Sequence, residues 1–377
     1  MTTVKENVRS RIFAKSSLRI CLFGDATNVH LIRWAEALRA RGIDLFIITY
    51  REAKLPDFQL YDISCSEMRG NADYERFLRF FRGIKMFFLL RRSIRKIQPD
   101  IVHVHYLVNT PLVFAFWGFR RLVVSPWGND IIFDRGKEPW SVIIYKKVLL
   151  RWARQVTATT MFLGKHIRQY AKVNPTIIPF GVDTKKFSGK AHSSRKEIAL
   201  TFVKHLEEKY GARYLIKAVP LILKECAELR VNIVGRGALE QELRDLVNQK
   251  GLQNHIYFHG KFNHDQVVGI LRHSDIFVMP SIYESEIFGV AAIEASSMML
   301  PVVATDFPGI REAVVDCETG ILIPPANSRA IADACIKLIK HPALMRQMGK
   351  KGRRYVKANF EWKDCVDRML AVYRKVL

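Results

Sequence analysis

The chain has 377 residues, of which 49% are hydrophobic and 25% are charged, and its formal net charge is +24. This is enough for two globular domains with sizeable cores, and six cysteines without a C-x-x-C pair exclude a disulfide framework or a zinc site. Residues 1–180 hold 30 Lys and Arg against 14 Asp and Glu, so this half should attract nucleic acid, acidic lipid or a pyrophosphate-bearing substrate, unless its charge is only a solvated surface.

Strand and helix patterns alternate along the first half of the chain. Apolar, β-rich segments at residues 18–23, 43–49, 101–105, 122–125 and 156–160 predict strands, with helical patterns between them. The first strand ends in the polar turn 24–28, and the helix after it begins near Val29 and is stopped by Gly42. This alternation predicts an α/β fold with a parallel sheet covered on both faces.

The segment 76–98 is predicted to be a basic aromatic helix. It contains eight Lys and Arg, five Phe and no acid, and its apolar residues recur at helical spacing: Phe77, Phe81, Ile84, Phe88, Ile94 and Ile97. A helix that covers a sheet must bury such a stripe. The additional aromatics Phe80 and Phe87 and the cationic surround instead favour docking to an anionic membrane.

A second series of strands follows a break near Pro179. The polar stretch 184–196 is typical of a linker, and strands are predicted at 198–203, 229–234, 255–259, 275–279, 301–305 and 320–323. We therefore expect domains at 1–183 and 197–359, with an amphipathic helix over 360–377. Ligands of such sheets lie outside the carboxyl ends of the strands, so both halves should point their functional loops at a shared cleft.

Localisation is predicted from the apolar segments. Residues 1–17 lack the apolar core of a signal peptide, and the mostly apolar run 106–119 is too short to span a bilayer. A reducing, cytoplasmic location follows, with peripheral attachment to the inner face of a membrane left open.

The most informative stretch runs from the strand at 275–279 into a helix that begins near Val290. Glu286 lies in the turn and Glu294 about two turns inside the helix, roughly 12 Å away at ~1.5 Å per residue. The backbone N–H groups of Phe288, Gly289 and Val290 are first-turn donors that suit a phosphate. Together they indicate binding of a sugar, a phosphate and a ribose on one sheet edge.

This stretch resembles the Glu-x7-Glu signature of retaining family 4 glycosyltransferases, which have the GT-B fold of two Rossmann-like domains facing a central cleft. The likeness covers nearly the whole chain, and further fragments lie at 99–105, 178–183, 234–237, 258–260, 275–281 and 360–362. It implies transfer of a sugar from a UDP- or GDP-sugar to a glycan or lipid-linked glycan acceptor in surface polysaccharide synthesis. In this family the last helix crosses back to the first domain.

The resemblance assigns roles to both carboxylates. Glu294 is expected to accept hydrogen bonds from the ribose hydroxyls. Glu286 is expected beside the donor sugar, where it would orient hydroxyls and stabilise positive charge at the anomeric carbon without forming a covalent adduct. Glu284 is the weaker alternative for that role.

The donor diphosphate needs cations. Lys204 and Lys209 follow the first strand of the second domain, and the family places cations near Lys204-His205 and Lys209-Tyr210, although this chain lacks the usual Gly-Arg-Leu form. Solvated loop lysines are the alternative. Gly235 would allow close backbone approach to the base, and an ordinary tight turn explains it nearly as well.

Acceptor-side candidates lie in the first domain. Trp127, Asn129 and Asp130 follow a strand, where many relatives carry a His, and Asp130 could equally be a helix N-cap. His105 ends a strand on the same edge and could equally be a core histidine. The turn ending at Asn28 lacks the family's paired glycines but could contact acceptor or donor phosphate through backbone N–H groups.

No Asp-x-Asp motif lies in the predicted cleft loops, so we expect neither metal nor cofactor. Two alternatives remain: a GT-B epimerase or phosphorylase, and a non-enzymatic nucleic-acid-binding protein. Because the chain has no recognised DNA or RNA module, a nucleic-acid partner is not expected.

Overall fold

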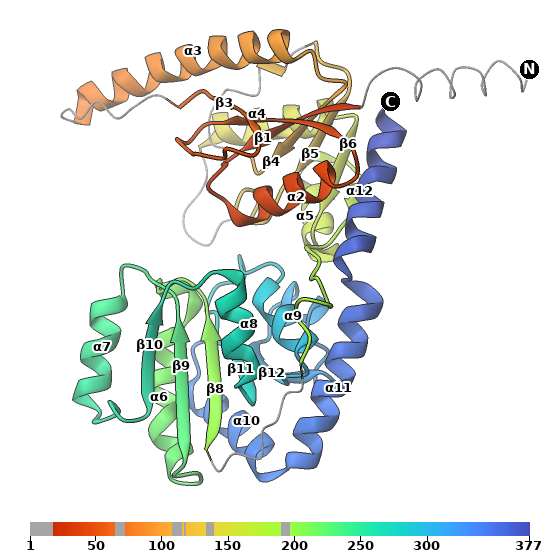
Figure 1. Ribbon diagram of the computed structural model, residues 1–377. Coiled ribbons are helices and arrows are strands. Elements are labelled where there is room, and N and C mark those ends of the chain that lie inside the picture. Colours follow the sequence, from red (N-terminus) through yellow and green to blue (C-terminus); the bar gives the residue numbers. More distant parts are fainter. Residues whose placement is uncertain (1–17, 65–71, 108–114, 117, 133–138, 190–196) are drawn as a thin grey trace, which may run out of the picture. The chain divides into compact units, whose positions relative to one another are not determined.

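A computed structural model describes residues 18–64, 72–107, 115–116, 118–132, 139–189 and 197–377, with backbone only for residues 72–82. It divides into two compact units (Figure 1). The first contains Met1–Ala158, Gly164–Ile177 and Val366–Leu377, and the second contains Thr159–Leu163 and Ile178–Cys365. Residues 1–17, the end of the predicted linker (190–196) and part of the apolar run 106–119 lie outside the described residues.

The N-terminal unit is built on a seven-stranded parallel sheet in the order β3-β2-β1-β4-β5-β6-β7. The strands are β1 (Arg19–Gly24), β2 (Asp44–Thr49), β3 (Gln59–Asp62), β4 (Ile101–His105), β5 (Leu122–Ser125), β6 (Gln155–Ala158) and β7 (Thr176–Ile177). Its helices are α2 (Val29–Arg39), α3 (Ala72–Ile97), α4 (Trp140–Trp152) and α5 (Met161–Ala171), the last of which begins in the second unit.

The C-terminal unit has a six-stranded parallel sheet in the order β10-β9-β8-β11-β12-β13. Its strands are β8 (Ile198–Val203), β9 (Leu229–Val234), β10 (Ile256–Gly260), β11 (Ile276–Met279), β12 (Val302–Thr305) and β13 (Gly320–Ile323). Helices cover both faces (Figure 1): α6 (Ala212–Leu223), α7 (Glu240–Gln249), α8 (His264–Arg272), α9 (Val290–Ser297), α10 (Ser328–Lys340) and α11 (Pro342–Asn359). Short 3-10 turns occur at Glu208–Tyr210 (η2) and Ile310–Glu312 (η3).

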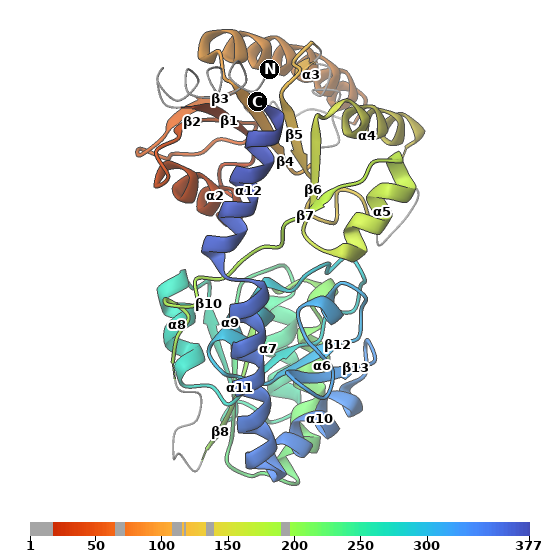
Figure 2. The ribbon, with the colours of Figure 1, turned by 90° about the vertical axis from the view of Figure 1, so that its right-hand side faces the viewer.

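The last helix, α12 (Trp362–Val376), starts in the C-terminal unit, and its residues from Val366 onward belong to the N-terminal unit. In that unit α12 lies beside the sheet (Figure 2). Tyr373 of α12 is buried, and its hydroxyl lies 2.6 Å from Nδ1 of His103 in β4. This hydrogen bond fixes the end of the chain to the middle of the N-terminal sheet.

The predicted α/β class is confirmed, and every predicted strand is present within about two residues. The sequence prediction missed β3 and β7. β3 is an edge strand of four residues without a buried member, and β7 has two residues, so neither shows an apolar run.

The basic helix differs from expectation. α3 contains the predicted segment, and Leu90 and Ile97 are buried, but Ile84 is 39% and Phe88 65% exposed. The apolar stripe is therefore not fully covered by the unit, because its middle faces away from the sheet.

Candidate functional site

The central feature of the C-terminal unit is an ion pair between Lys204 and Glu286. Nζ of Lys204 lies 2.6 Å from Oε1 of Glu286, and the two side chains are 18% and 14% exposed. Lys204 follows β8 directly and Glu286 lies in the loop after β11, so neighbouring strands bring the two residues to one sheet edge. An opposite charge at this distance, partly shielded from water, holds both side chains in place.

The backbone around Lys204 is fastened to the turn after β9. Leu206 N–H donates to the carbonyl of Arg236 at 2.9 Å, and a Cβ built on Gly235 would lie 1.9 Å from the carbonyl oxygen of Lys204. Gly235 also has φ +147°, which disfavours any other residue. Its function in this structure is therefore to let the two loops approach closely, which positions Lys204.

One aromatic ring lies near both candidate lysines. Nζ of Lys204 lies 5.1 Å and Nζ of Lys209 4.7 Å from the ring centroid of Tyr210, both within cation–π range. Burial raises the pKa of Tyr210 to about 12, so its hydroxyl stays protonated at neutral pH. His205 is exposed, with its ring centroid 6.3 Å from that of Tyr210. The sequence prediction did not include Tyr210 among the site residues. Its position directly after Lys209 was the feature of the sequence that could have indicated it.

The loop from Glu286 to α9 is irregular. α9 begins at Val290 as predicted, but Gly289 has φ +69° and Glu294 is the fifth helical residue, one turn inside the helix. The predicted position two turns inside was wrong, because residues 286–289 are not helical. The rise of a helix therefore does not give the separation of Glu286 and Glu294. Glu294 is 6% exposed, while Glu284 is exposed.

The start of α9 offers backbone donors. Among hydrogen bonds between described residues, none uses the N–H of Phe288, Gly289 or Val290. The Phe288 ring is buried, 5.2 Å from the ring centroid of Phe360 and 6.5 Å from that of Phe180. A contact of Phe288 with a ligand would therefore involve its backbone, because its side chain belongs to the core.

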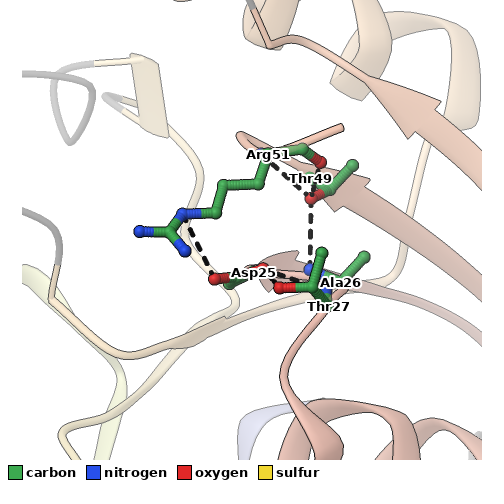
Figure 3. A network of polar contacts seen from close by, with 5 residues as sticks. All are labelled: Asp25, Ala26, Thr27, Thr49 and Arg51. Atoms are coloured by element: carbon green, nitrogen blue, oxygen red, sulfur yellow. Dashed lines mark hydrogen bonds and ion pairs between the residues drawn. The ribbon is translucent and has the colours of Figure 1, made fainter. Parts of the chain in front are cut away.

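The turn after β1 uses its own polar groups. Asp25 Oδ1 accepts from the N–H and the hydroxyl of Thr27, its Oδ2 lies 3.4 Å from Nε of Arg51, and Ala26 N–H donates to Oγ1 of Thr49 (Figure 3). Asn28 N–H donates to the Asp25 carbonyl, and the Asn28 side chain caps α2 by accepting from His30 N–H. The N–H groups of Ala26, Thr27 and Asn28 therefore already have internal partners, and a phosphate at this turn would have to compete with them.

Asp130 holds the loop after β5. Its carboxylate accepts from the N–H groups of Leu107, Trp127 and Gly128 at 2.7–3.2 Å, and the residue is 1% exposed. Burial raises the pKa of this carboxyl group against the lowering effect of these backbone donors. Asp130 lies in a turn, so the helix N-cap alternative was wrong. Asn129 beside it is exposed.

His105 and Trp127 belong to an aromatic group at the same edge. The His105 ring lies 3.9 Å from that of His103 and 5.7 Å from that of Trp127. Neither ring nitrogen of His105 hydrogen-bonds to any residue that the structure describes, although the side chain is 1% exposed. Burial lowers the pKa of His105 to about 3, so the imidazole is neutral. It is a core histidine, but one with unused hydrogen-bonding atoms.

Within the described parts of the chain, no group of three or more His, Cys, Asp or Glu side chains could hold a metal ion. Nor is any described helix both long enough and apolar enough to pass through a bilayer. The positive groups at the C-terminal sheet edge include Lys204, Lys209 and the start of α9. This arrangement suits an anionic ligand with an adjoining polyol, because the edge holds cations, backbone donors and a carboxylate.

Comparison with known proteins agrees with this geometry. The family model described as Glycosyl transferases group 1 matches residues 183–355, and the one described as Glycosyl transferase 4-like matches residues 19–160. A phosphatidyl-myo-inositol mannosyltransferase of Mycobacterium leprae is 24% identical over 356 residues, which cover 92% of each chain.

Solved structures resemble the whole chain. A sucrose-phosphate synthase from Thermosynechococcus elongatus superposes with a TM-score of 0.80 at 21% identity, covering 96% of this chain and 99% of its own. A protein from Anabaena in complex with UDP superposes with a TM-score of 0.73 at 16% identity, covering 94% and 99%. The chain therefore belongs to the glycosyltransferases that the two family models describe, and it has the GT-B fold.

Proposed function

We propose that the protein is a retaining, metal-independent hexosyltransferase that moves a sugar from a UDP- or GDP-sugar to a glycan or lipid-linked glycan in surface polysaccharide synthesis. The observation that carries this proposal is the Lys204–Glu286 pair, which places a cation and a carboxylate 2.6 Å apart at the sheet edge. The bound UDP of the Anabaena protein and the mannosyltransferase activity named for the Mycobacterium leprae relative are consistent with it.

The pair gives each residue a task when donor binds. A diphosphate oxygen would replace Glu286 as the partner of Lys204, and Lys204 and Lys209 would stabilise the negative charge that collects on the leaving nucleoside diphosphate. The released Glu286 carboxylate would face the sugar, orient its hydroxyls and stabilise positive charge at the anomeric carbon. Backbone donors at the start of α9 would hold phosphate, and Glu294 the ribose.

A thermal-shift screen of UDP-, GDP-, ADP- and CMP-sugars tests this function. We expect one nucleotide class to raise the melting temperature, and the same class to support transfer to an acceptor. If no sugar nucleotide raises it, the donor site is refuted. If free epimer or sugar phosphate appears without acceptor, the protein is an epimerase or a phosphorylase instead.

We also propose that the N-terminal unit docks on an anionic membrane surface, which would bring a lipid-linked acceptor within reach. Eight large hydrophobic side chains of the described residues are exposed, and five of them lie on α3 and α4: Ile84, Phe88, Trp140, Ile144 and Val148. On α3, the basic residues Lys85, Arg92, Arg95 and Lys96 are also exposed. Exposed apolar side chains on a unit that also exposes cations suit such a surface.

Flotation with liposomes that contain anionic lipid tests the docking. We expect Phe88→Ser combined with Trp140→Ser to reduce the floating fraction severalfold, whereas Met161→Ser, at a residue 67% exposed on α5, should have no effect. Equal flotation of the two variants, or none of the wild type, would refute the docking.

A further inference from the structure

One face of the β8–β10 half of the C-terminal sheet carries several polar side chains, which is unusual for a parallel sheet. In β8, β9 and β10, alternate residues such as Leu200, Val231 and Ile256 pack into the apolar core. The residues between them point to the opposite face and include the polar side chains of Thr201, Arg230, Asn232 and His259. Parallel sheets normally bury apolar side chains on both faces, so this polarity requires another explanation.

A cavity of about 420 Å³ lies over this polar face, between the strands and α8. Its volume is that of a small-ligand pocket. None of the residues proposed above for donor binding lines it, and Ala199 in its wall lies five residues before Lys204, roughly 16 Å along an extended strand. The cavity is therefore distinct from the donor edge.

A series of hydrogen bonds between side chains orients the polar groups in the wall of the cavity. Asn232 Nδ2 donates to Oγ1 of Thr201 at 3.4 Å, which leaves Asn232 Oδ1 to accept from His259 Nε2 at 2.9 Å. His259 Nε2 must then carry the hydrogen, so Nδ1 is an acceptor. No described residue donates to Nδ1, and burial together with the charge of Arg230 lowers the pKa of His259, which keeps the ring neutral.

The charges of the cavity cancel. Of the described lining residues, the only Lys, Arg, Asp or Glu are Arg230 and Glu197, whose side chains lie 3.7 Å apart. Gln266 adds an amide and Phe262 an apolar ring. An anion would find its cation already paired, whereas a neutral polyol could donate to His259 and Glu197 and lay a C–H face on Phe262.

The wall contributed by α8 keeps the space open. Gly269 lies inside this helix, where Gly is less favourable than Ala, and a Cβ built on it meets nothing within 4 Å. A larger residue would therefore fit the helix but would occupy the cavity.

We propose that this cavity is a second binding site for a neutral, hydroxyl-rich ligand of one or two sugar rings. The site goes beyond the proposed transferase function, because it would hold a saccharide away from the residues that bind the donor. Its occupant would pack between α8 and the polar sheet face.

Saturation-transfer NMR and titration calorimetry with methyl α-mannoside, methyl α-glucoside and maltose test the proposal on the full chain. We expect at least one probe to bind. Gly269→Leu, which fills the cavity, should weaken that binding at least tenfold, whereas the matched control Gly269→Ala should leave the affinity within twofold. His259→Phe should also weaken it at least tenfold.

Three results would overturn the proposal: no probe binds the wild-type chain, binding survives Gly269→Leu, or saturating UDP or GDP displaces the saccharide. The last result would make the cavity part of the donor site. The first two outcomes do not depend on the thermal-shift screen with sugar nucleotides, so the failure of one proposal can be told from the failure of the other.

Discussion

At the edge of the C-terminal sheet, the side chains of Lys204 and Glu286 form an ion pair with each other. At the edge of the N-terminal sheet, the acids Asp25 and Asp130 instead accept hydrogen bonds from nearby backbone N–H groups. A side-chain pair can exchange its partner for a ligand without changing the fold, whereas a carboxylate that satisfies buried backbone donors, as Asp130 does, cannot leave them without loss of stability. We therefore expect the charges that take part in the reaction to lie at the C-terminal sheet edge. The N-terminal sheet edge should contribute mainly the shape of its binding surface.

The largest effect should come from Glu286. We expect Glu286→Gln to lower turnover by about 10²–10³-fold, because a preorganised charge near the reacting atoms is lost while nucleotide binding remains. The measurement is kcat and KM with the donor found by thermal shift. Glu284→Gln, at an exposed acid two residues earlier, is the matched control and should stay within about threefold. Equal turnover in Glu286→Gln would remove this residue from the mechanism.

A change at Glu294 should act on binding. Loss of two charge-assisted hydrogen bonds to ribose hydroxyls, each ~1.5–3 kcal/mol, should weaken nucleotide affinity at least tenfold and abolish the thermal shift in Glu294→Ala. Calorimetry with the nucleoside diphosphate measures this directly. Because Glu294 is 6% exposed, Glu294→Gln serves as the shape-preserving variant. Nucleotide affinity that is unchanged in both variants would refute the ribose role.

The buried histidine His105 at the N-terminal sheet edge should make the stability of the protein depend on pH. His105 has a folded pKa of about 3 and an unfolded pKa of ~6.5, so the unfolded chain binds more protons between these values and stability falls as the pH drops below 6.5. Between pH 7 and 5.5 the free energy of unfolding should fall by about 1.2 kcal/mol from this group. Urea unfolding at both pH values measures it.

His103 should add to this decline, because burial and its neighbour His105 lower its pKa well below the usual value. We expect His105→Phe to remove part of the decline between pH 7 and 5.5. His341→Phe, at an exposed histidine, should leave the decline unchanged. An unaltered decline in His105→Phe would show that His105 is not buried in its neutral form.

The smallest effect is expected at Asp25. Its partner Arg51 is 68% exposed, so Asp25→Asn should lower the free energy of unfolding by no more than about 1 kcal/mol and change turnover less than threefold. Arg51→Gln should match it in both measurements. A tenfold loss of turnover in Asp25→Asn alone would contradict the comparison and place a reactive acid at the N-terminal edge.

The sequence predicted the fold because the strands carry apolar runs of the right length between turns. It located β4, β5, β8, β9 and β13 to the residue, and the start of α9 at Val290. It missed β3 because Gln59 and its neighbours are not buried, and edge pairing depends on β2 rather than on their own pattern. At the candidate site, residue types were predictable but hydrogen-bond partners were not.

By itself, the sequence determined the two parallel-sheet halves, the family and the identity of the charged residues after β8 and β11, because these follow from local patterns of a few residues. Only the tertiary structure decided which polar groups meet. It paired Lys204 with Glu286 across 82 positions, placed the Tyr210 ring within cation–π range of two lysines, and bound Asp130 to Leu107. Such contacts depend on how neighbouring strands bring together loops that are far apart in the sequence. The periodicity of apolar residues along the chain does not show which loops meet.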